Sequence, residues 1–86
     1  MKTNNTPKFS TSNFYLAAFL LVKGLSLIRL DRTNPKRCEF VFDDTAEREP
    51  LAQAFAFANE NDQVLLVDAR RIIAAIKNLK EKLYED

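Results

Sequence analysis

Hydrophobic positions change their spacing along the chain, and each spacing predicts a different element. Residues 14–22 form an unbroken apolar run, preceded by the hydroxyl side chains of residues 10–12 and followed closely by Gly24. Hydroxyls favour the start of a helix, and glycine accepts the left-handed backbone that ends one. The run predicts a helix that is apolar almost all round. Such a helix is either buried centrally or presents a second face to a partner.

A partial alternation of apolar and polar residues follows and predicts a β-hairpin. Residues 25–32 alternate in part, residues 33–36 have the composition of a turn, and Phe40 and Phe42 then alternate with their neighbours. A period of two is typical of a strand with one buried face, and a turn between two such strands pairs them as a hairpin. We therefore expect Phe40 and Phe42 to be core residues.

Three further segments complete the predicted order. Acidic residues and a proline in residues 43–50 are typical of a helix start, and the helix that follows is expected to reach about Ala58. The short apolar run of residues 63–67 predicts a strand. Asp68 can cap a last helix, in which we expect the apolar stripe to supply core residues. That stripe consists of Ile72, Ile76, Leu79 and Leu83.

The predicted order α-β-β-α-β-α places the chain in the α+β class. Residues 1–9 are polar and predict a flexible N-terminal tail, whereas residues 10–86 predict a single domain. Right-handed crossovers are strongly preferred, so the third strand is expected beside the first strand and antiparallel to it. The predicted fold is a small three-stranded, mostly antiparallel sheet with helices mainly on one face.

The amino-acid composition favours a protein with a packed core in a reducing compartment. Of 86 residues, 47% are hydrophobic, which indicates a packed core, and one is a cysteine, so no disulfide forms within the chain. A lone cysteine fits a reducing compartment, and we expect a cytoplasmic location. The longest apolar run is far shorter than the roughly 20 residues that span a bilayer, so no membrane partner is expected.

Candidate chemistry is sparse. The chain has no histidine, which removes the commonest general base and the Ser-His and Cys-His pairs. The acids Asp43, Asp44, Glu47 and Glu49 could hold Mg²⁺ or act as paired acid and base. Acids in the first turn of a helix also stabilise its dipole, however, and this spacing matches no cation loop. We assign no catalytic, metal-binding or cofactor-binding residue and expect no cofactor, so a carboxylate-metal enzyme is the least favoured function.

Several short stretches between Phe9 and Tyr84 match the pattern of one family. They are Ser10-Thr11-Ser12, Tyr15-Leu16-Ala17-Ala18, Leu20, Lys23-Gly24, Phe40-Val41-Phe42-Asp43 and Val67-Asp68-Ala69-Arg70, followed by Ile76, Leu79, Lys80, Leu83 and Tyr84. In these residues the chain resembles a family of small single-domain bacterial and phage proteins catalogued as a domain of unknown function. The resemblance implies no activity and no site. Members look like accessory proteins of plasmids, phages and mobile elements, which implies nucleic-acid or machinery-binding roles by association only.

Charge is distributed unevenly along the chain. Residues 1–37 carry seven basic residues and one acid, residues 38–68 carry one basic residue and eight acids, and the net charge is +1. A basic zone that could contact phosphates consists of Arg29, Arg32, Lys36 and Arg37 on the hairpin with Arg70 and Arg71 on the last helix. The isoelectric point is near 7.8, whereas nucleic-acid binders more often exceed about 9. Solvated surface charge is therefore the favoured interpretation.

These observations favour a non-enzymatic interaction module that binds itself or a protein partner. Tyr15, Phe19 and Val22 of the apolar helix are the candidate contacts, with an open sheet edge as a second possibility. A small domain hides an all-apolar helix less easily than a large one, so we expect a homodimer or larger assembly. A small nucleic-acid-binding accessory protein of a plasmid, phage or mobile element remains the alternative.

Overall fold

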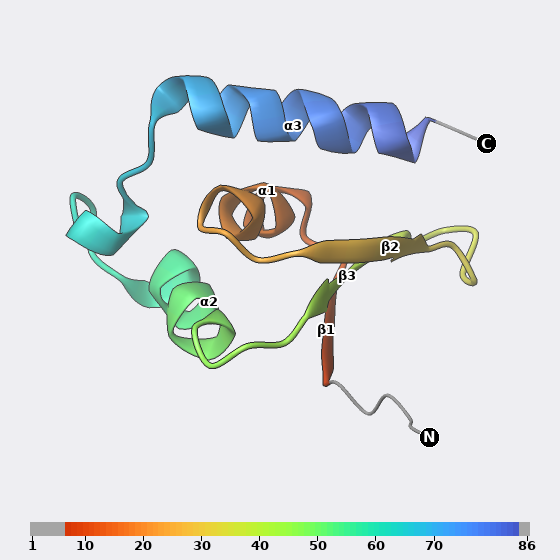
Figure 1. Ribbon diagram of the computed structural model, residues 1–86, viewed down its shortest axis with the longest axis horizontal. Coiled ribbons are helices and arrows are strands. Elements are labelled where there is room, and N and C mark those ends of the chain that lie inside the picture. Colours follow the sequence, from red (N-terminus) through yellow and green to blue (C-terminus); the bar gives the residue numbers. More distant parts are fainter. Residues whose placement is uncertain (1–6, 85–86) are drawn as a thin grey trace.

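Seven elements follow one another in the computed structural model, which describes residues 7–84 (Figure 1). The three strands form one antiparallel sheet in the order β1-β3-β2. The predicted α+β class and three-stranded antiparallel sheet are therefore confirmed. In chain order the elements are β1 (Lys8–Thr11), α1 (Phe14–Val22), β2 (Leu27–Asp31), β3 (Glu39–Asp43), α2 (Arg48–Phe57), the 3-10 helix η1 (Gln63–Leu65) and α3 (Ala69–Leu83).

The register of the sheet places its aromatic residues on one face. Phe9 lies opposite Phe42 on β3, while Thr11 and Leu30 both lie opposite Phe40. Residues directly opposite each other share a face of an antiparallel sheet. This face packs against α1 and α3, and Phe40 and Phe42 are only 2% and 0% exposed. The prediction that both phenylalanines are core residues is confirmed.

Helix α1 lies at the centre of the fold, between α3 and α2 (Figure 1). Its middle residues, Ala17 to Leu20, are buried, which resolves the two alternatives for this helix in favour of a central position. The side chain of Asn13 caps the helix by accepting hydrogen bonds from the backbone N–H groups of Tyr15 and Leu16, both at 3.1 Å. Gly24 has a φ of 103° and ends the helix as predicted.

The third strand comes from a different segment than predicted. Residues 63–67 were predicted as a strand beside β2, but Gln63–Leu65 forms η1 instead. The Asp62 carboxylate accepts the Val64 N–H at 3.0 Å and stabilises this turn, and an apolar run so short has no periodicity to distinguish strand from helix. The third strand is β1, which lies beside β3. It begins at Lys8, within the predicted tail, whose residues 1–6 lie outside the described residues.

Helix α3 is strongly amphipathic and crosses over α1. Asp68 caps it as predicted, by accepting the N–H groups of Arg70 and Arg71 at 2.8 and 3.4 Å. Leu79 is fully buried, whereas Ile72 and Ile76 are half-buried and pack against the core. Within residues 7–84, no helix combines the length and apolar character that a membrane span requires.

Helix α2 is held to the rest of the fold at both ends. Near its C-terminal end, Phe55 packs on Phe19 of α1 with ring centroids 5.2 Å apart. At its start, Arg48 donates to both carboxylate oxygens of Asp44 at 2.8 and 3.0 Å, and its guanidinium lies 4.3 Å from the centroid of the Phe9 ring on β1. Hydrogen bonds from Arg48 lower the pKa of Asp44. Arg48 therefore ties α2 to the edge of the sheet.

Candidate protein-binding surface at the end of α1

The structure separates the three residues predicted to contact a partner. Phe19 is 4% exposed and packs on Phe55, so it belongs to the core and is not available to a partner. Tyr15 is 64% exposed at the start of α1, and Val22 is half-buried at its end. Tyr15 and Val22 lie about 10 Å apart along the helix, at its two ends. Of these two residues, Val22 lines one of the hollows described below.

A first hollow lies between the C-terminal end of α1 and the middle of α3. It has a volume of about 350 Å³. Leucine, valine and alanine side chains form its apolar lining. Arg71 and Asn78 are its polar lining residues. The residues that line it are Leu21, Val22, Arg71, Ala74, Ala75 and Asn78.

A second hollow lies between the end of α1, the start of α2 and η1. It has a volume of about 330 Å³ and is lined by Lys23, Glu47, Pro50, Leu51 and Val64. Leu21 and Val22 line the first hollow and Lys23 lines the second, so both hollows include residues from the end of α1. We call the residues lining both hollows the α1-end surface.

Local chemistry explains why the end of α1 stays accessible. The left-handed backbone at Gly24 ends the helix and turns the chain towards β2. Lys23 extends sideways: its Nζ donates to the Leu66 carbonyl oxygen at 3.4 Å and lies 5.6 Å from the centroid of the Phe19 ring. Leu66 itself is 59% exposed. The ammonium of Lys23 therefore lies at the rim of the second hollow, next to an exposed leucine.

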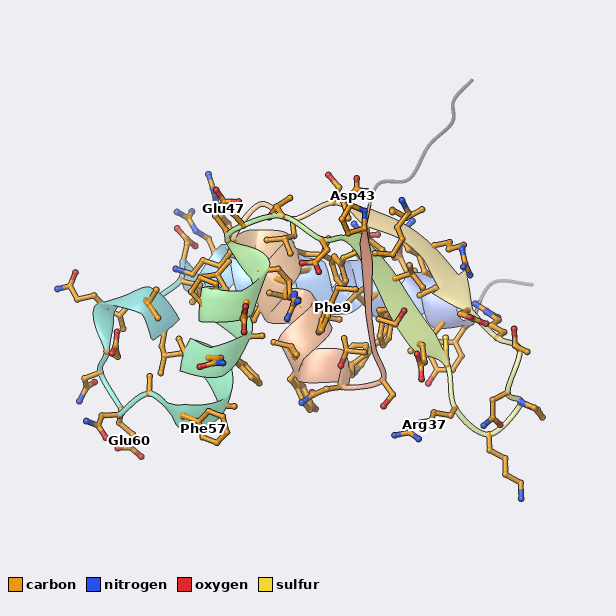
Figure 2. The ribbon with its side chains drawn as sticks, turned by 90° about the horizontal axis from the view of Figure 1, so that it is seen from below. Phe9, Arg37, Asp43, Glu47, Phe57 and Glu60 are labelled. Carbon is orange, nitrogen blue, oxygen red and sulfur yellow. The ribbon has the colours of Figure 1, made fainter. Side chains whose placement is uncertain are left out.

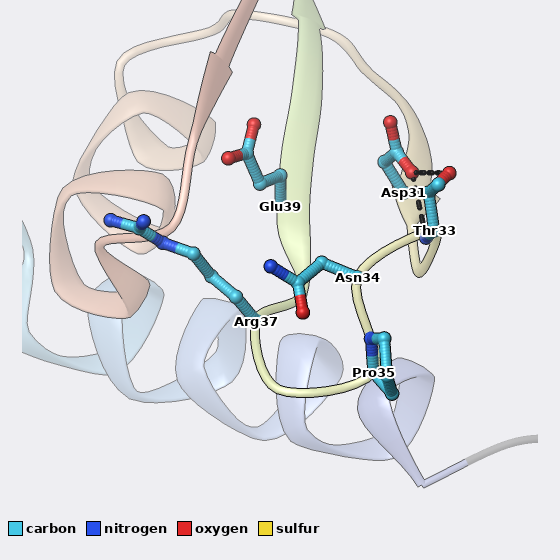
Figure 3. Close-up of a pocket in the computed structure, with 6 residues that line it drawn as sticks. All are labelled: Asp31, Thr33, Asn34, Pro35, Arg37 and Glu39. Atoms are coloured by element: carbon cyan, nitrogen blue, oxygen red, sulfur yellow. Dashed lines mark hydrogen bonds between the residues drawn. The ribbon is translucent and has the colours of Figure 1, made fainter.

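The hairpin forms a third hollow of different chemistry (Figure 3). It has a volume of about 490 Å³ and is lined by Asp31, Thr33, Asn34, Pro35, Arg37 and Glu39. Asp31 accepts hydrogen bonds from the Thr33 hydroxyl at 2.6 Å and N–H at 2.9 Å, and these bonds lower its pKa. Arg37 donates to the Ser12 hydroxyl at 3.2 Å. Polar groups of Asp31, Thr33 and Arg37 thus already have partners within the fold, as expected of a stabilised turn.

The six residues of the predicted basic zone lie at two ends of the molecule. Arg32 belongs to the hairpin and donates to the backbone carbonyl of Lys82 at the end of α3. Arg70 and Arg71 lie in the first turn of α3, at the other end of that helix (Figure 1). Arg29 pairs with Asp31 at 3.7 Å on β2. The structure therefore places Lys82, which sequence reasoning missed, closer to the hairpin than Arg70 and Arg71.

Two acids of the predicted cluster, Asp43 and Asp44, form ion pairs within the fold. Asp43 pairs with Lys8 at 3.7 Å across two strands, and Asp44 pairs with Arg48. Within the described residues, no group of three or more His, Cys, Asp or Glu side chains is arranged to hold a metal ion. The aromatic residues of the three strands face the core, so none of them offers a platform for stacking a nucleic-acid base.

Comparison with known proteins places the chain in a family. Searches of curated proteins and of solved structures found no match. A family model with the description "Domain of unknown function (DUF5659)" matches residues 6–85, which confirms the resemblance inferred from the sequence. Because the match covers nearly the whole chain, the chain belongs to this family of domains of unknown function.

Proposed function

We propose that the chain is a non-enzymatic protein-binding domain and that the α1-end surface is where a partner docks. The supporting observation is that two hollows with apolar lining residues both include the end of α1, with Lys23, Glu47 and Arg71 as their charged lining residues. Protein interfaces commonly have an apolar centre surrounded by a polar rim. The floor consists of side chains held by well-defined helices, so a partner would meet a surface that is already formed.

The protonation behaviour of the acids supports a role other than catalysis. A general acid or base works best when its pKa lies near the working pH. The pKa values of Asp31 and Asp44 are both lowered from the ordinary carboxyl value, away from neutrality. In each case the first cause is a hydrogen bond to the ionised carboxylate, from Thr33 and Arg48 respectively. These acids act as structural acceptors.

The edges of the sheet are less suited to a partner than the α1-end surface. Edge strands recruit other chains through their unpaired backbone groups, and prolines, lysines and bulges oppose this. Pro7 precedes the edge strand β1, which begins at Lys8, and the register of the edge strand β2 shifts between Leu27 and Arg29. Both edges therefore carry features that disfavour the addition of another strand, and the edge-binding alternative is not retained.

A site-specific photo-crosslinker tests the proposed surface. A crosslinking amino acid at Ala74, inside the first hollow, is compared with one at Lys77, which is exposed on α3 but does not line either hollow. We expect illumination in an extract of the native host to give a discrete protein adduct from position 74 and none from position 77.

A second variant shows whether the adduct depends on the surface. Val22→Asp places a charge in the floor of the first hollow, where Val22 is only half-buried, and it should abolish the adduct at position 74 while the far-ultraviolet circular dichroism is unchanged. Equal labelling at positions 74 and 77, or no protein adduct at either, would contradict the proposed function.

A further inference from the structure

We infer that the partner is a second copy of this chain, docked about a two-fold axis that passes through the hollow between α1, α2 and η1. This inference rests on the proposed function and specifies its partner. It is supported by the placement of Lys23 and Glu47, one base and one acid that line the same apolar hollow.

Neither charge takes part in an ion pair among residues 7–84. The ion pairs of the described residues join Lys8 to Asp43, Arg29 to Asp31, Arg48 to Asp44 and Arg70 to Asp68. Lys23 hydrogen-bonds to a neutral carbonyl group, that of Leu66, and Glu47 starts α2 without a capping bond from its side chain. Each is therefore available to pair with an opposite charge on another molecule.

A base and an acid that line one patch make that patch complementary to itself. Rotation by 180° about an axis through the patch brings Lys23 of one copy to Glu47 of the other, and the same rotation forms the second pair. Two ion pairs are thus gained from one contact. A partner of a single charge sign would match only one of the two residues, so the mixed lining favours a second copy.

The floor of the patch adds the apolar contact that such a dimer needs. Pro50 is exposed, and Leu51 and Val64 are half-buried. A second copy placed over this patch covers these side chains, and burial of apolar area stabilises association roughly in proportion to the area removed from water. Leu66 is 59% exposed, and its backbone contacts Lys23. The exposed Leu66 side chain can therefore extend the apolar contact between the two copies.

Charge reversal in a mixing experiment tests the two-fold contact. Lys23→Glu and Glu47→Lys each set like charges against one another at both pairs, and each should weaken self-association by more than about 100-fold, because facing like charges cost several kcal/mol. An equimolar mixture of the two variants restores both opposite-charge pairs and should give a 1:1 heterodimer of wild-type strength. Sedimentation velocity over a concentration series at low salt measures each case.

One control variant and one of the two test variants distinguish a lost contact from an altered fold. Lys36→Glu makes the same change of charge in the exposed hairpin loop, outside the α1-end surface, and should leave association unchanged. The Glu47 side chain is exposed, so Glu47→Lys preserves the fold, and its loss of self-association supports the inference even where Lys23→Glu alters the structure.

The remaining outcomes separate this inference from the proposed function. A chain that stays monomeric at every concentration, yet crosslinks from position 74 to a different protein, overturns the dimer and retains the binding surface. A monomer without any adduct from position 74 overturns both. A wild-type dimer that is indifferent to Lys23→Glu and Glu47→Lys, or a mixture that fails to associate, overturns the two-fold contact through this hollow.

Discussion

The centre of the molecule, formed by α1 and β3, contrasts with the arm formed by α2 and η1. In the described part of the chain, α1 and β3 supply seven of the nine buried hydrophobic residues, whereas α2 and η1 supply none. Figure 2 shows Phe57 and Glu60 on the arm at one end of the molecule and Arg37 of the hairpin towards the other. Stability is thus concentrated in the centre, and the arm carries accessible apolar side chains such as Phe57.

This contrast shows that apolar content and availability to a partner are different properties. The most apolar segment of the chain, α1, is buried along its middle because sheet and helices surround it. The α1-end surface arises instead where three less apolar segments converge on the end of that helix. The proposed binding surface exists because the neighbouring segments leave the end of α1 partly uncovered.

The largest expected effect comes from removing a ring at the centre. Phe42 is fully buried, so Phe42→Ala leaves a cavity and should lower the free energy of unfolding by about 3–5 kcal/mol. Phe57 on the arm is 82% exposed. The matched change Phe57→Ala should alter the free energy of unfolding by less than about 0.5 kcal/mol. Chemical denaturation measures both. Similar losses from the two variants would remove the distinction between centre and arm.

A smaller effect is expected where the centre ends and the α1-end surface begins. Gly24 has a φ of 103°, and an added Cβ would meet nothing within 4 Å, so the cost of Gly24→Ala comes from the backbone alone. We expect a loss of about 1–2 kcal/mol. Gly24→Asn should cost less, since asparagine tolerates left-handed backbone better. If Gly24→Ala had a higher denaturation midpoint than Gly24→Asn, the glycine would be kept for a reason other than its left-handed backbone.

A local effect is expected at the attachment of the arm. Arg48→Ala removes the hydrogen bonds to Asp44 and the stacking on Phe9, and Arg48→Lys keeps the charge without the planar fork. Amide exchange in α2 should accelerate in both variants, more in the alanine variant, while β3 stays protected. Equal acceleration in α2 and β3 would mean that the arm and the centre unfold as one unit.

The same attachment predicts a response to acid. The pKa of Asp44 is lowered in the folded chain by the hydrogen bonds from Arg48. The stabilisation is therefore complete above the ordinary carboxyl pKa of about 4 and is lost as the pH falls through the lowered value. The protection factors of the α2 amides, which correct for the pH dependence of intrinsic exchange, should fall below about pH 4 in the wild type and fall less in Arg48→Ala.

The smallest effect is expected at the hairpin tip, which belongs to neither region. Lys36 and Arg37 are exposed, so reversing both charges should change the free energy of unfolding by less than about 0.5 kcal/mol. We also expect no binding of DNA or RNA at physiological salt. Fluorescence anisotropy with labelled single- and double-stranded oligonucleotides over a salt series measures this. A tight complex that weakens steeply with salt would favour the nucleic-acid alternative instead.

Sequence patterns predicted most of the helices and strands because those segments are long enough to show a period. Strand β1 was missed since its four residues contain one apolar side chain, Phe9, and its pairing with β3 depends on distant residues. In residues 63–67 the capping bond from Asp62, which favours η1, does not appear in a hydrophobic pattern. The α1-end surface joins residues from four segments, and of the predicted interface residues only Val22 lies in it.

The place of β3 in the middle of the sheet also determines the order in which a growing chain can fold. Asp31 and Glu39 pair across a short loop, whereas Thr11 pairs with Phe40 across a much longer stretch that contains α1. Closing the longer loop costs more entropy. During synthesis, β1 and the apolar α1 leave the ribosome before the strand that will cover them exists. The nascent chain therefore lacks the contacts between its most apolar helix and β3 until β3 has emerged.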